Sequence, residues 1–250
     1  MPIDNLYGIT NGGSPRPAPP PSQTVKPAQQ STTPMCSQIP SRLVRRGDQE
    51  RWSPEEDAIP RVELHQKHVQ NARLLANREQ LLAKLPKHKV CAEIGVDKGD
   101  LSAQILQFAS PAKLHLIDAW GDSERYHDGH KRQVEEKFRE EIAQGRVEIN
   151  LGLSTAVLPT FPDAYFDWVY LDTAHTYSVT AAELAILKHK VKRKGIISGH
   201  DYCMGNWVVR RRYGVIEAVH ELCVQADWEL VFLTCETNQF RSFAIRKITP

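Results

Sequence analysis

From Lys89 to the end of the chain, short apolar runs alternate with longer segments of helical character. The apolar runs are VCAEIGV, KLHLIDAW, RVEINLGL, DWVYLD and GIISGHD. The segments between them include DLSAQILQFA, KRQVEEKFREEIAQ and TAAELAILKHKV. Strands that are separated by helices of this length need crossover connections. The pattern therefore predicts an α/β fold with a doubly wound, mostly parallel sheet and helices on both faces.

The last two apolar runs, WELVFLT and RSFAIRK, are separated only by a short polar stretch. A connection of this length fits a hairpin, so we expect one antiparallel strand to finish the sheet. In sheets of this kind, ligands bind outside the carboxyl ends of the strands. The residues that directly follow each predicted strand are therefore the candidates for a functional site.

The first 50 residues have a different composition, with nine of the 16 prolines, many Ser and Gln residues, and Tyr7 as the single aromatic residue. Such a segment cannot bury enough apolar surface to offset its ordering entropy. We expect a disordered tail over residues 1–50 and one folded domain over residues 51–250. The proline run is also of the kind that proline-reading domains bind, which leaves such a partner open.

A lead-in helix is expected at the start of the folded domain. In residues 61–86, leucines recur at helical spacing and Pro86 ends the run. These leucines are Leu74, Leu75, Leu81, Leu82 and Leu85. The pattern predicts one amphipathic helix before the first strand.

Composition excludes several classes of protein. The formal net charge of +2 is too small to indicate a nucleic-acid partner, although the run Arg210 to Arg212 leaves an acidic substrate open. The five cysteines form no C-x-x-C pair, so the sequence predicts neither a disulfide framework nor a zinc site. Without a long apolar segment or a signal-peptide pattern, we expect a cytoplasmic protein with no membrane partner.

The first strand ends in the turn EIGVDKGD, residues 93–100. Gly95 and Gly99 allow a tight turn and the close approach of a ligand. The carboxylates of Glu93 and its neighbours disfavour a pyrophosphate, which needs backbone N–H groups without competing negative charge. The turn instead suits a cationic cofactor without phosphate, such as S-adenosylmethionine. Asp118, at the end of the next strand, could accept hydrogen bonds from a ribose.

Two later strands each end in an aspartate with a histidine close by, in WVYLDTAHTY and GIISGHDY. Neighbouring strands lie about 4.8 Å apart, so Asp172 and Asp201 could direct their carboxylates into one space. Two hard oxygen ligands suit Mg²⁺. His175 could take a proton from a hydroxyl that faces this ion, because its ordinary pKa lies near neutral pH. The alternative is that both aspartates only accept hydrogen bonds from loop N–H groups.

Four motifs in this order, VCAEIGVDKGDLSAQIL, LHLIDAW, YLDTAHTY and GIISGHDY, resemble those of class I S-adenosylmethionine-dependent methyltransferases. The closer resemblance is to the macrolide and aminocoumarin sugar O-methyltransferases, with catechol O-methyltransferase more distant. It covers roughly Leu74 to Lys247. The resemblance implies a Rossmann-like, seven-stranded sheet whose last strand is antiparallel.

The same resemblance implies roles for single residues. A divalent metal, Mg²⁺ first, would be held by Asp172, His200 and Asp201, and many relatives have an acidic residue where His200 stands. His175 would be the catalytic base. The residues that would hold the cofactor are Glu93, Gly95, Gly99, Asp118, Trp120 and Ser154.

The resemblance implies methyl transfer to a hydroxyl of a small molecule such as a sugar. Two other classes of function stay open at this point. One is a nicotinamide-dependent oxidoreductase, against which the missing G-x-G-x-x-G pattern and the acidic turn count. The other is a non-catalytic cofactor-binding domain that presents the proline-rich tail. The sequence also leaves a homo-oligomer open.

Overall fold

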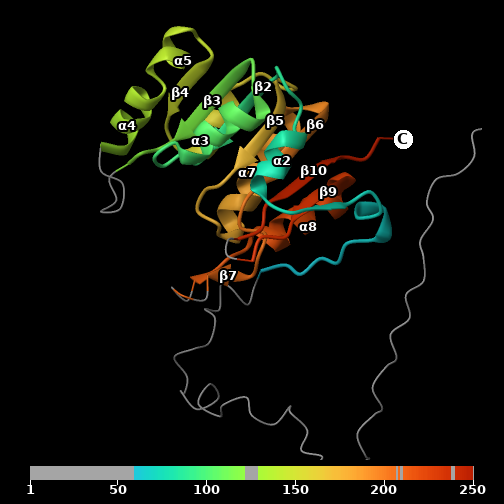
Figure 1. Cartoon of the computed structure of the whole chain (residues 1–250). Coiled ribbons are helices and arrows are strands. Elements are labelled where there is room, and N and C mark those ends of the chain that lie inside the picture. The colour runs from blue at the N-terminus through green and yellow to red at the C-terminus, as the bar shows by residue number, and fades with distance from the viewer. Residues whose placement is uncertain (1–58, 122–128, 207, 209–210, 238–239, 250) are drawn as a thin grey trace, which may run out of the picture. The chain divides into compact units, whose positions relative to one another are not determined.

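The computed structural model describes residues 59–121, 129–206, 208, 211–237 and 240–249. The chain divides into two units, residues 1–50 and residues 51–250. The first unit and the predicted disorder of its tail lie outside the described residues. The second unit contains the sheet and the helices shown in Figure 1.

In the described residues, the core of this unit is an eight-stranded sheet with the order β1-β9-β10-β6-β5-β2-β3-β4. Its strands are β1 (Arg73–Leu75), β2 (Val90–Ile94), β3 (Lys113–Asp118), β4 (Val147–Leu151), β5 (Phe166–Leu171), β6 (Val191–Gly199), β9 (Trp228–Thr234) and β10 (Phe243–Lys247). Within this sheet, β10 runs antiparallel to its neighbours β6 and β9, and the other neighbouring pairs are parallel. The predicted α/β, Rossmann-like sheet with an antiparallel last strand is confirmed, with one strand more than the seven expected.

The additional strand replaces part of the predicted lead-in helix, so a single helix over residues 61–86 is wrong. Leu74 and Leu75 lie in β1, which pairs in parallel with β9, and Leu74 is 70% exposed. The helix α2 begins only at Arg78, because the Asn77 side chain accepts a hydrogen bond from the Gln80 N–H and caps it. The backbone edge of β9 thus pairs with a segment whose leucine spacing suits a helix as well as a strand.

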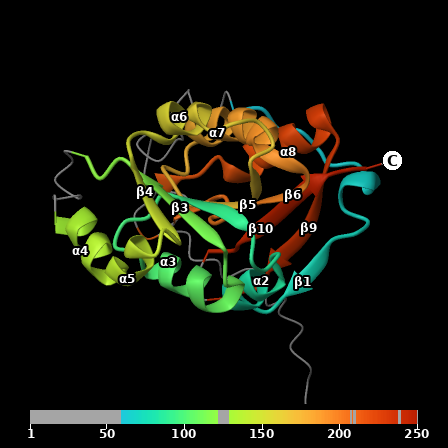
Figure 2. The same ribbon diagram turned by 90° about the horizontal axis from the view of Figure 1, so that it is seen from above.

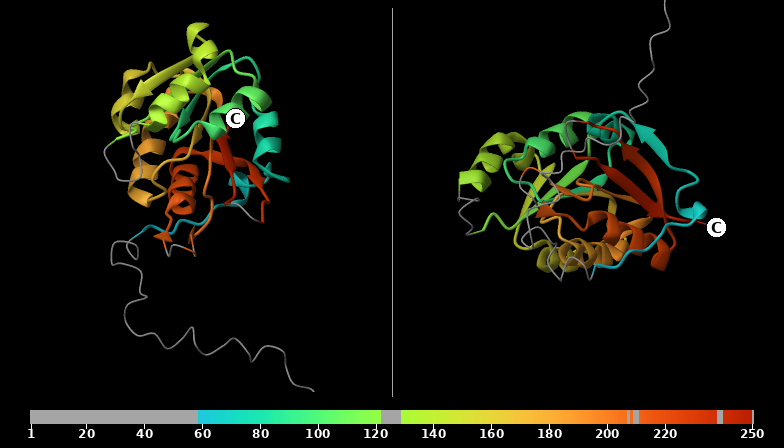
Figure 3. Two further views of the ribbon diagram at one scale, coloured as in Figure 1. Left: turned by 60° about the vertical axis from the view of Figure 1, so that its left-hand side comes forward. Right: turned by 90° about the horizontal axis from the view of Figure 1, so that it is seen from below.

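Helices cover both faces of the sheet (Figure 2). They are α2 (Arg78–Lys84), α3 (Asp100–Gln104), α4 (Gly129–Lys137), α5 (Arg139–Ala143), α6 (Ser154–Val157), α7 (Tyr177–Lys190) and α8 (Val215–Ala226). Shorter elements are η1 (Gln66–His68), the π-helical turn η2 (Ile105–Ala109), η3 (Leu158–Thr160), and the paired strands β7 (Gly205–Asn206) and β8 (Arg211–Arg212). α6, α7 and α8 lie on one face of the sheet, and α2 and α3 lie on the other. Figure 3 shows the same arrangement from two further directions.

Two apolar clusters fill the space between the sheet and its helices. Phe166 of β5 lies in the cluster under α7 and α8, and Trp168 lies in the cluster under α2 and α3. Both side chains are fully buried, and the Trp168 indole donates a hydrogen bond to the Pro86 carbonyl. Burying a large apolar side chain stabilises the fold by about 1.5 to 3 kcal/mol. β5 is therefore anchored on both faces, which fixes the position of its carboxyl end.

The winding of the sheet reverses between β2 and β5. From β2 the chain builds outward through β3 and β4, and from β5 it builds in the other direction through β6. A reversal of this kind leaves a crevice at the carboxyl ends of the two central strands. By this rule, a ligand is expected beside the residues that follow β2, β3, β5 and β6. No helix in the described ranges combines the length and the apolar character that crossing a bilayer requires.

Candidate functional site

The turn after β2 depends on two glycines in left-handed backbone conformations. Gly95 has φ of +87° and Gly99 has φ of +72°. A Cβ atom on Gly95 would lie 2.0 Å from the backbone oxygen of Asp172, and one on Gly99 would lie 2.8 Å from the Phe138 ring. Both predicted glycines are thus required by the local backbone and packing. Gly95 also brings the turn into direct contact with the end of β5.

Asp118, at the end of β3, holds this turn through backbone hydrogen bonds. Its Oδ2 accepts from the N–H groups of Val96 (2.7 Å) and Asp97 (3.0 Å). Its Oδ1 accepts from the N–H of Trp120 at 2.8 Å. The Trp120 indole is buried and donates to the Asp97 carbonyl at 2.9 Å. A carboxylate has about four acceptor positions, so one position of Asp118 remains for a ligand hydroxyl.

Glu93 is fully buried beneath the same turn. Its Oε2 accepts a hydrogen bond from the Ser102 hydroxyl, and its Oε1 has no hydrogen-bond partner among the described residues. Burial raises the pKa of Glu93 well above its ordinary value, and the nearby charges of Asp172 and Asp118 raise it further. An unsatisfied oxygen in the interior is costly, and it is expected where a ligand completes the site.

Ser154 is the first residue of α6, and its hydroxyl donates to Glu183 Oε1 at 2.5 Å. Glu183, on α7, also accepts a hydrogen bond from the Thr173 hydroxyl at 2.8 Å. These contacts tie α6 to the loop after β5. The role of Ser154 in holding the cofactor stays a prediction.

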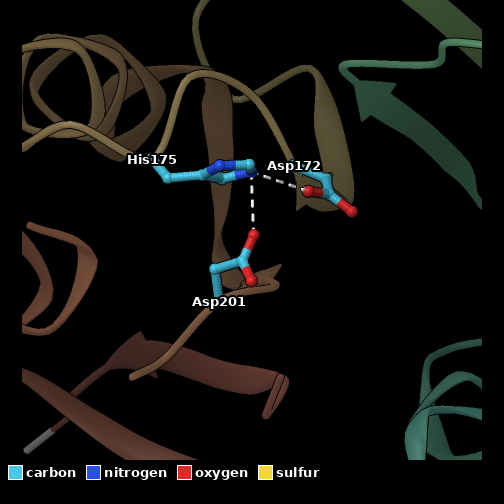
Figure 4. A group of neighbouring side chains, drawn as sticks. All are labelled: Asp172, His175 and Asp201. Atoms are coloured by element: carbon cyan, nitrogen blue, oxygen red, sulfur yellow. Dashed lines mark hydrogen bonds and ion pairs between the residues drawn. The ribbon is translucent and has the colours of Figure 1, made fainter. Parts of the chain in front are cut away.

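The predicted cluster at the ends of β5 and β6 forms as the sequence indicates. Asp172 follows β5, His175 lies in the loop before α7, and Asp201 follows β6 (Figure 4). His175 Nε2 lies 3.2 Å from Asp172 Oδ1 and 2.8 Å from Asp201 Oδ2. One possible ligand atom from each residue falls within 4.8 Å of the others. Asp201 is 3% exposed, and its Oδ1 has no hydrogen-bond partner in the described part of the chain.

Two members of this cluster have an unusual backbone. His175 has φ of +60° and Asp201 has φ of +56°. Residues with side chains adopt this left-handed region at a cost of order 1 to 3 kcal/mol, and such residues gather at functional sites. The backbone strain coincides with the convergence of the two side chains.

His200 lies beside the cluster and connects it to Arg78. Its Nδ1 lies 3.5 Å from one oxygen each of Asp172 and Asp201, and its Nε2 lies 2.5 Å from Arg78 Nη2. A guanidinium can only donate, so this contact is a hydrogen bond only when Nε2 is unprotonated. The tight group of ligand atoms thus includes His175, the predicted base, and does not include His200, a predicted metal ligand.

The carboxylates and imidazoles shift one another's pKa values. Burial alone lowers the pKa of His175, but its hydrogen bonds to Asp172 and Asp201 and their charges raise it to about 9. The pKa of His200 is also raised to about 9 against burial, and Arg78 opposes this shift. Burial raises the pKa of both aspartates, and the imidazoles more than reverse this and lower it. A proton on His175 thus offsets part of the negative charge of the two carboxylates, whereas a second proton on His200 would remove its hydrogen bond from Arg78.

Three further residues surround the cluster, and the sequence reasoning missed them. The Tyr213 ring lies 4.8 Å from the His175 ring, and the Phe240 ring lies 6.3 Å from the His200 ring, measured between centroids. Arg78 is the third. None of them belongs to a recognisable motif, and the position of Arg78 depends on the unexpected strand β1.

The basic run that left an acidic substrate open is only partly exposed. The buried Arg212 guanidinium pairs with Glu217 and donates to the Met204 carbonyl, so it has a structural role. Arg211 is exposed and donates to the Ala174 carbonyl at 3.3 Å. Arg210 lies outside the described residues.

The residues present fit a cationic cofactor and a divalent metal. Glu93 supplies a buried oxygen without a partner, and Asp118 retains an acceptor position. In the cluster, the nitrogen of His175 lies 2.8 and 3.2 Å from the two carboxylate oxygens. Adjacent ligands of an octahedral ion with bonds of about 2.1 Å are roughly 3 Å apart, so these distances are compatible with a small divalent ion as well as with hydrogen bonds.

Comparison with known proteins agrees with this geometry. Residues 92–202 match a family model described as a methyltransferase domain. No curated protein matches the sequence significantly. Among solved structures, the pyocyanin biosynthetic protein PhzM aligns with 14% identity and a TM-score of 0.52, over 68% of this chain and 54% of that one. A candidate rRNA methylase from Clostridium thermocellum aligns with 14% identity and a TM-score of 0.53, over 70% of this chain and 98% of that one.

The aligned part of this chain spans about half the length of PhzM, and identities this low show a shared fold alone. The family match adds the type of domain. Residues 92–202 therefore form a methyltransferase domain, and the sheet has the Rossmann-like fold of class I S-adenosylmethionine-dependent methyltransferases.

Proposed function

We propose that this protein transfers a methyl group from S-adenosylmethionine to a hydroxyl of a small molecule, such as a sugar, with the assistance of a divalent metal. One observation carries this proposal. The turn that would hold the cofactor and the acidic cluster are in contact, because Gly95 packs against the Asp172 backbone and the Asp172 N–H donates to the Ile94 carbonyl at 2.8 Å. A cofactor and a hydroxyl bound at these two places would be neighbours.

On the cofactor side, S-adenosylmethionine supplies an electrophilic methyl group on a sulfonium when it is bound. Asp118 would accept a hydrogen bond from its ribose through the acceptor position that the turn leaves unused. Glu93 would direct its unpartnered oxygen toward the positive end of the cofactor. Trp120 holds the turn closed through its hydrogen bond to Asp97.

On the acceptor side, a divalent ion, Mg²⁺ first, supplies positive charge that lowers the pKa of a hydroxyl. Asp172 and Asp201 would hold this ion, and the unpartnered Oδ1 of Asp201 supports that role. The acceptor oxygen would take the methyl group as the bond from that methyl group to sulfur breaks. The carboxylates raise the pKa of His175 to about 9, so His175 would take the hydroxyl proton only after a bound ion has displaced the proton that the ring already carries.

A second assignment for His175 is favoured by its position. Its Nε2 lies in the same group of ligand atoms as the two carboxylates, so His175 could be the third metal ligand in place of His200. Imidazole is a better ligand for Mn²⁺, Fe²⁺ or Zn²⁺ than for Mg²⁺. The choice of metal therefore depends on which of the two roles His175 has.

The proposal is tested by binding and by turnover. S-adenosylhomocysteine and NAD are titrated separately into the purified protein by calorimetry, and only the first is expected to bind. Hydroxylated small molecules, with RNA as a comparison, are then incubated with labelled methyl donor before and after chelation of metals. Label on a small molecule, lost on chelation and restored by Mg²⁺ or Mn²⁺, supports the proposal. Binding of S-adenosylhomocysteine without transfer to any hydroxyl would instead support a non-catalytic domain.

A further inference from the structure

A cavity of about 450 Å³ opens beside the acidic cluster, on the side of His200. Its lining includes Arg78, Gln104, His200, Glu236 and Phe240. The lining does not include any residue predicted to hold the cofactor, whereas His200 contacts both carboxylates of the cluster. The volume lies within the range of small-molecule sites. Its position thus suits the acceptor rather than the cofactor.

The guanidinium of Arg78 lacks a carboxylate partner in this cavity. Among the described residues, its Nε is buried without a hydrogen-bond partner, and no carboxylate lies within 4.0 Å of its nitrogens. Its Nη2 contacts a ring nitrogen of His200 instead. A charge in a partly buried place is costly without an opposite charge. An anionic ligand would supply the missing partner, and guanidinium binds carboxylates with two parallel hydrogen bonds.

Glu236 presents the complementary feature on the same lining. Its Oε1 accepts a hydrogen bond from the Arg78 backbone N–H, and its Oε2 is buried without a partner in the described part of the chain. Asn77 and Glu79 also line the cavity, and among its described residues one buried donor, on Arg78, and one buried acceptor, on Glu236, have no partner. A ligand that combines a carboxylate with a hydroxyl satisfies both, and the Phe240 ring adds an apolar wall.

We propose that the methyl acceptor is a hydroxylated carboxylic acid whose carboxylate binds Arg78 and one of whose hydroxyls donates to Glu236. Another hydroxyl of the same molecule faces Asp172 and Asp201. This inference rests on the proposed function, since it names the substrate class for that site. It assigns selectivity to residues on α2 and after β9, away from the cofactor turn.

Binding tests the inference without any need for turnover. The full chain is saturated with S-adenosylhomocysteine, and 3,4-dihydroxybenzoate and glucuronate are titrated in by calorimetry, each beside its methyl ester. At least one acid should bind roughly 10- to 100-fold more tightly than its ester, which is the loss expected for a charge-assisted hydrogen bond. Equal binding of acid and ester, or no binding of either acid, overturns the inference.

Variants of Arg78 then test whether this residue causes the preference for the acid over its ester. Arg78→Gln should remove the preference for the acid, leave ester binding unchanged, and leave the dissociation constant of S-adenosylhomocysteine within about twofold. Arg78→Lys should restore part of the preference, because it keeps the charge but loses the planar fork. Arg73→Gln is the matched control, since Arg73 is exposed on β1 and outside the cavity lining. Thermal denaturation confirms that each variant is folded.

The outcomes separate this inference from the proposed function. A preference for acids that Arg78→Gln leaves intact overturns the inference while methyl transfer still stands. A loss of S-adenosylhomocysteine binding in Arg78→Gln, with the acid preference intact, would assign Arg78 to the cofactor and also overturn it. Acids that bind through Arg78 without ever being methylated, while other hydroxyl compounds are methylated, would overturn the inference and leave the proposed function standing.

Discussion

The two halves of the carboxyl edge of the sheet are stabilised in different ways. After β2 and β3, Asp118 accepts its hydrogen bonds from backbone N–H groups. After β5 and β6, Asp172 and Asp201 face the imidazoles of His175 and His200. Backbone amides do not change charge, whereas the two imidazoles, with their pKa raised to about 9 beside the carboxylates, can hold protons that a cation displaces. The first half is therefore built before any ligand arrives, and the second half can release protons to a cation that replaces them.

The largest effect is expected from substitutions in the second half of the carboxyl edge, after β5 and β6. Asp201→Asn keeps the shape of the side chain but removes its charge, and one remaining carboxylate rarely holds Mg²⁺. We expect turnover and the response to added Mg²⁺ to be abolished, with Asp172→Asn behaving alike. Rates of labelled methyl transfer against metal concentration check this. S-adenosylhomocysteine affinity in Asp201→Asn serves as the control. Turnover that survives both substitutions and exhaustive chelation contradicts the metal-assisted mechanism.

His175→Ala separates the two roles proposed for His175. If this residue is the base, the rate should fall by roughly 10² to 10⁴, the range for a positioned proton acceptor, while metal affinity is kept. Turnover measured beside Mn²⁺ titration gives both quantities. A parallel loss of metal affinity would make His175 a ligand, and an unchanged rate would exclude both roles.

A smaller effect is expected in the first half. Asp118→Ala should weaken binding of S-adenosylhomocysteine by about 1 to 3 kcal/mol, because hydrogen bonds to a carboxylate are lost and the turn is loosened. Calorimetric titration measures the change. Asp100→Ala is the control, since Asp100 lies on the same turn with its side chain 83% exposed and pairs with Lys137. Equal affinity in both variants would remove Asp118 from the cofactor site.

His115 contrasts with His175 and His200, because its pKa is lowered whereas theirs is raised. It is 2% exposed in β3, and burial lowers its pKa from 6.5 to about 4, although Glu148 opposes this shift. The folded protein thus keeps His115 neutral where the unfolded chain binds a proton. Its contribution to stability is complete above pH 6.5 and is lost as the pH falls toward 4, by up to roughly 3 kcal/mol.

Urea unfolding at several pH values tests this contribution against His115→Phe. The variant has no imidazole to titrate, so its free energy of unfolding should fall less steeply between pH 6.5 and pH 4. The difference between the two slopes is the measured quantity, and a lower overall stability of the variant does not affect it. Parallel slopes would show that His115 titrates at its ordinary pKa in the folded protein.

Local sequence patterns were sufficient to predict the convergence of Asp172, His175 and Asp201. Each aspartate follows a strongly apolar strand, and the crossover rule makes the two strands neighbours. The residues that contact these side chains could not be predicted from the sequence. His200 was expected at a metal, yet its Nε2 faces Arg78, which is 122 residues away in the sequence. Contacts of this kind depend on packing that residue spacing does not encode.

Strand β1 was missed for the same reason. The spacing of its leucines fits a helix and a strand equally well, and the choice is made by pairing with β9 from the far end of the chain. A single-sequence pattern contains no information on that pairing. The position of Arg78, and with it the lining of the cavity, was therefore beyond prediction.

β1 has a further consequence through its pairing with β9. The pairing, together with the Cys235 N–H that donates to the Leu75 carbonyl, joins the segment before Arg78 to the segment before Glu236. Both segments lie outside residues 92–202, the part that matches the methyltransferase family model. If the acceptor binds as proposed, these two flanks form one surface where substitutions would change acceptor preference without altering the cofactor turn or the acidic cluster.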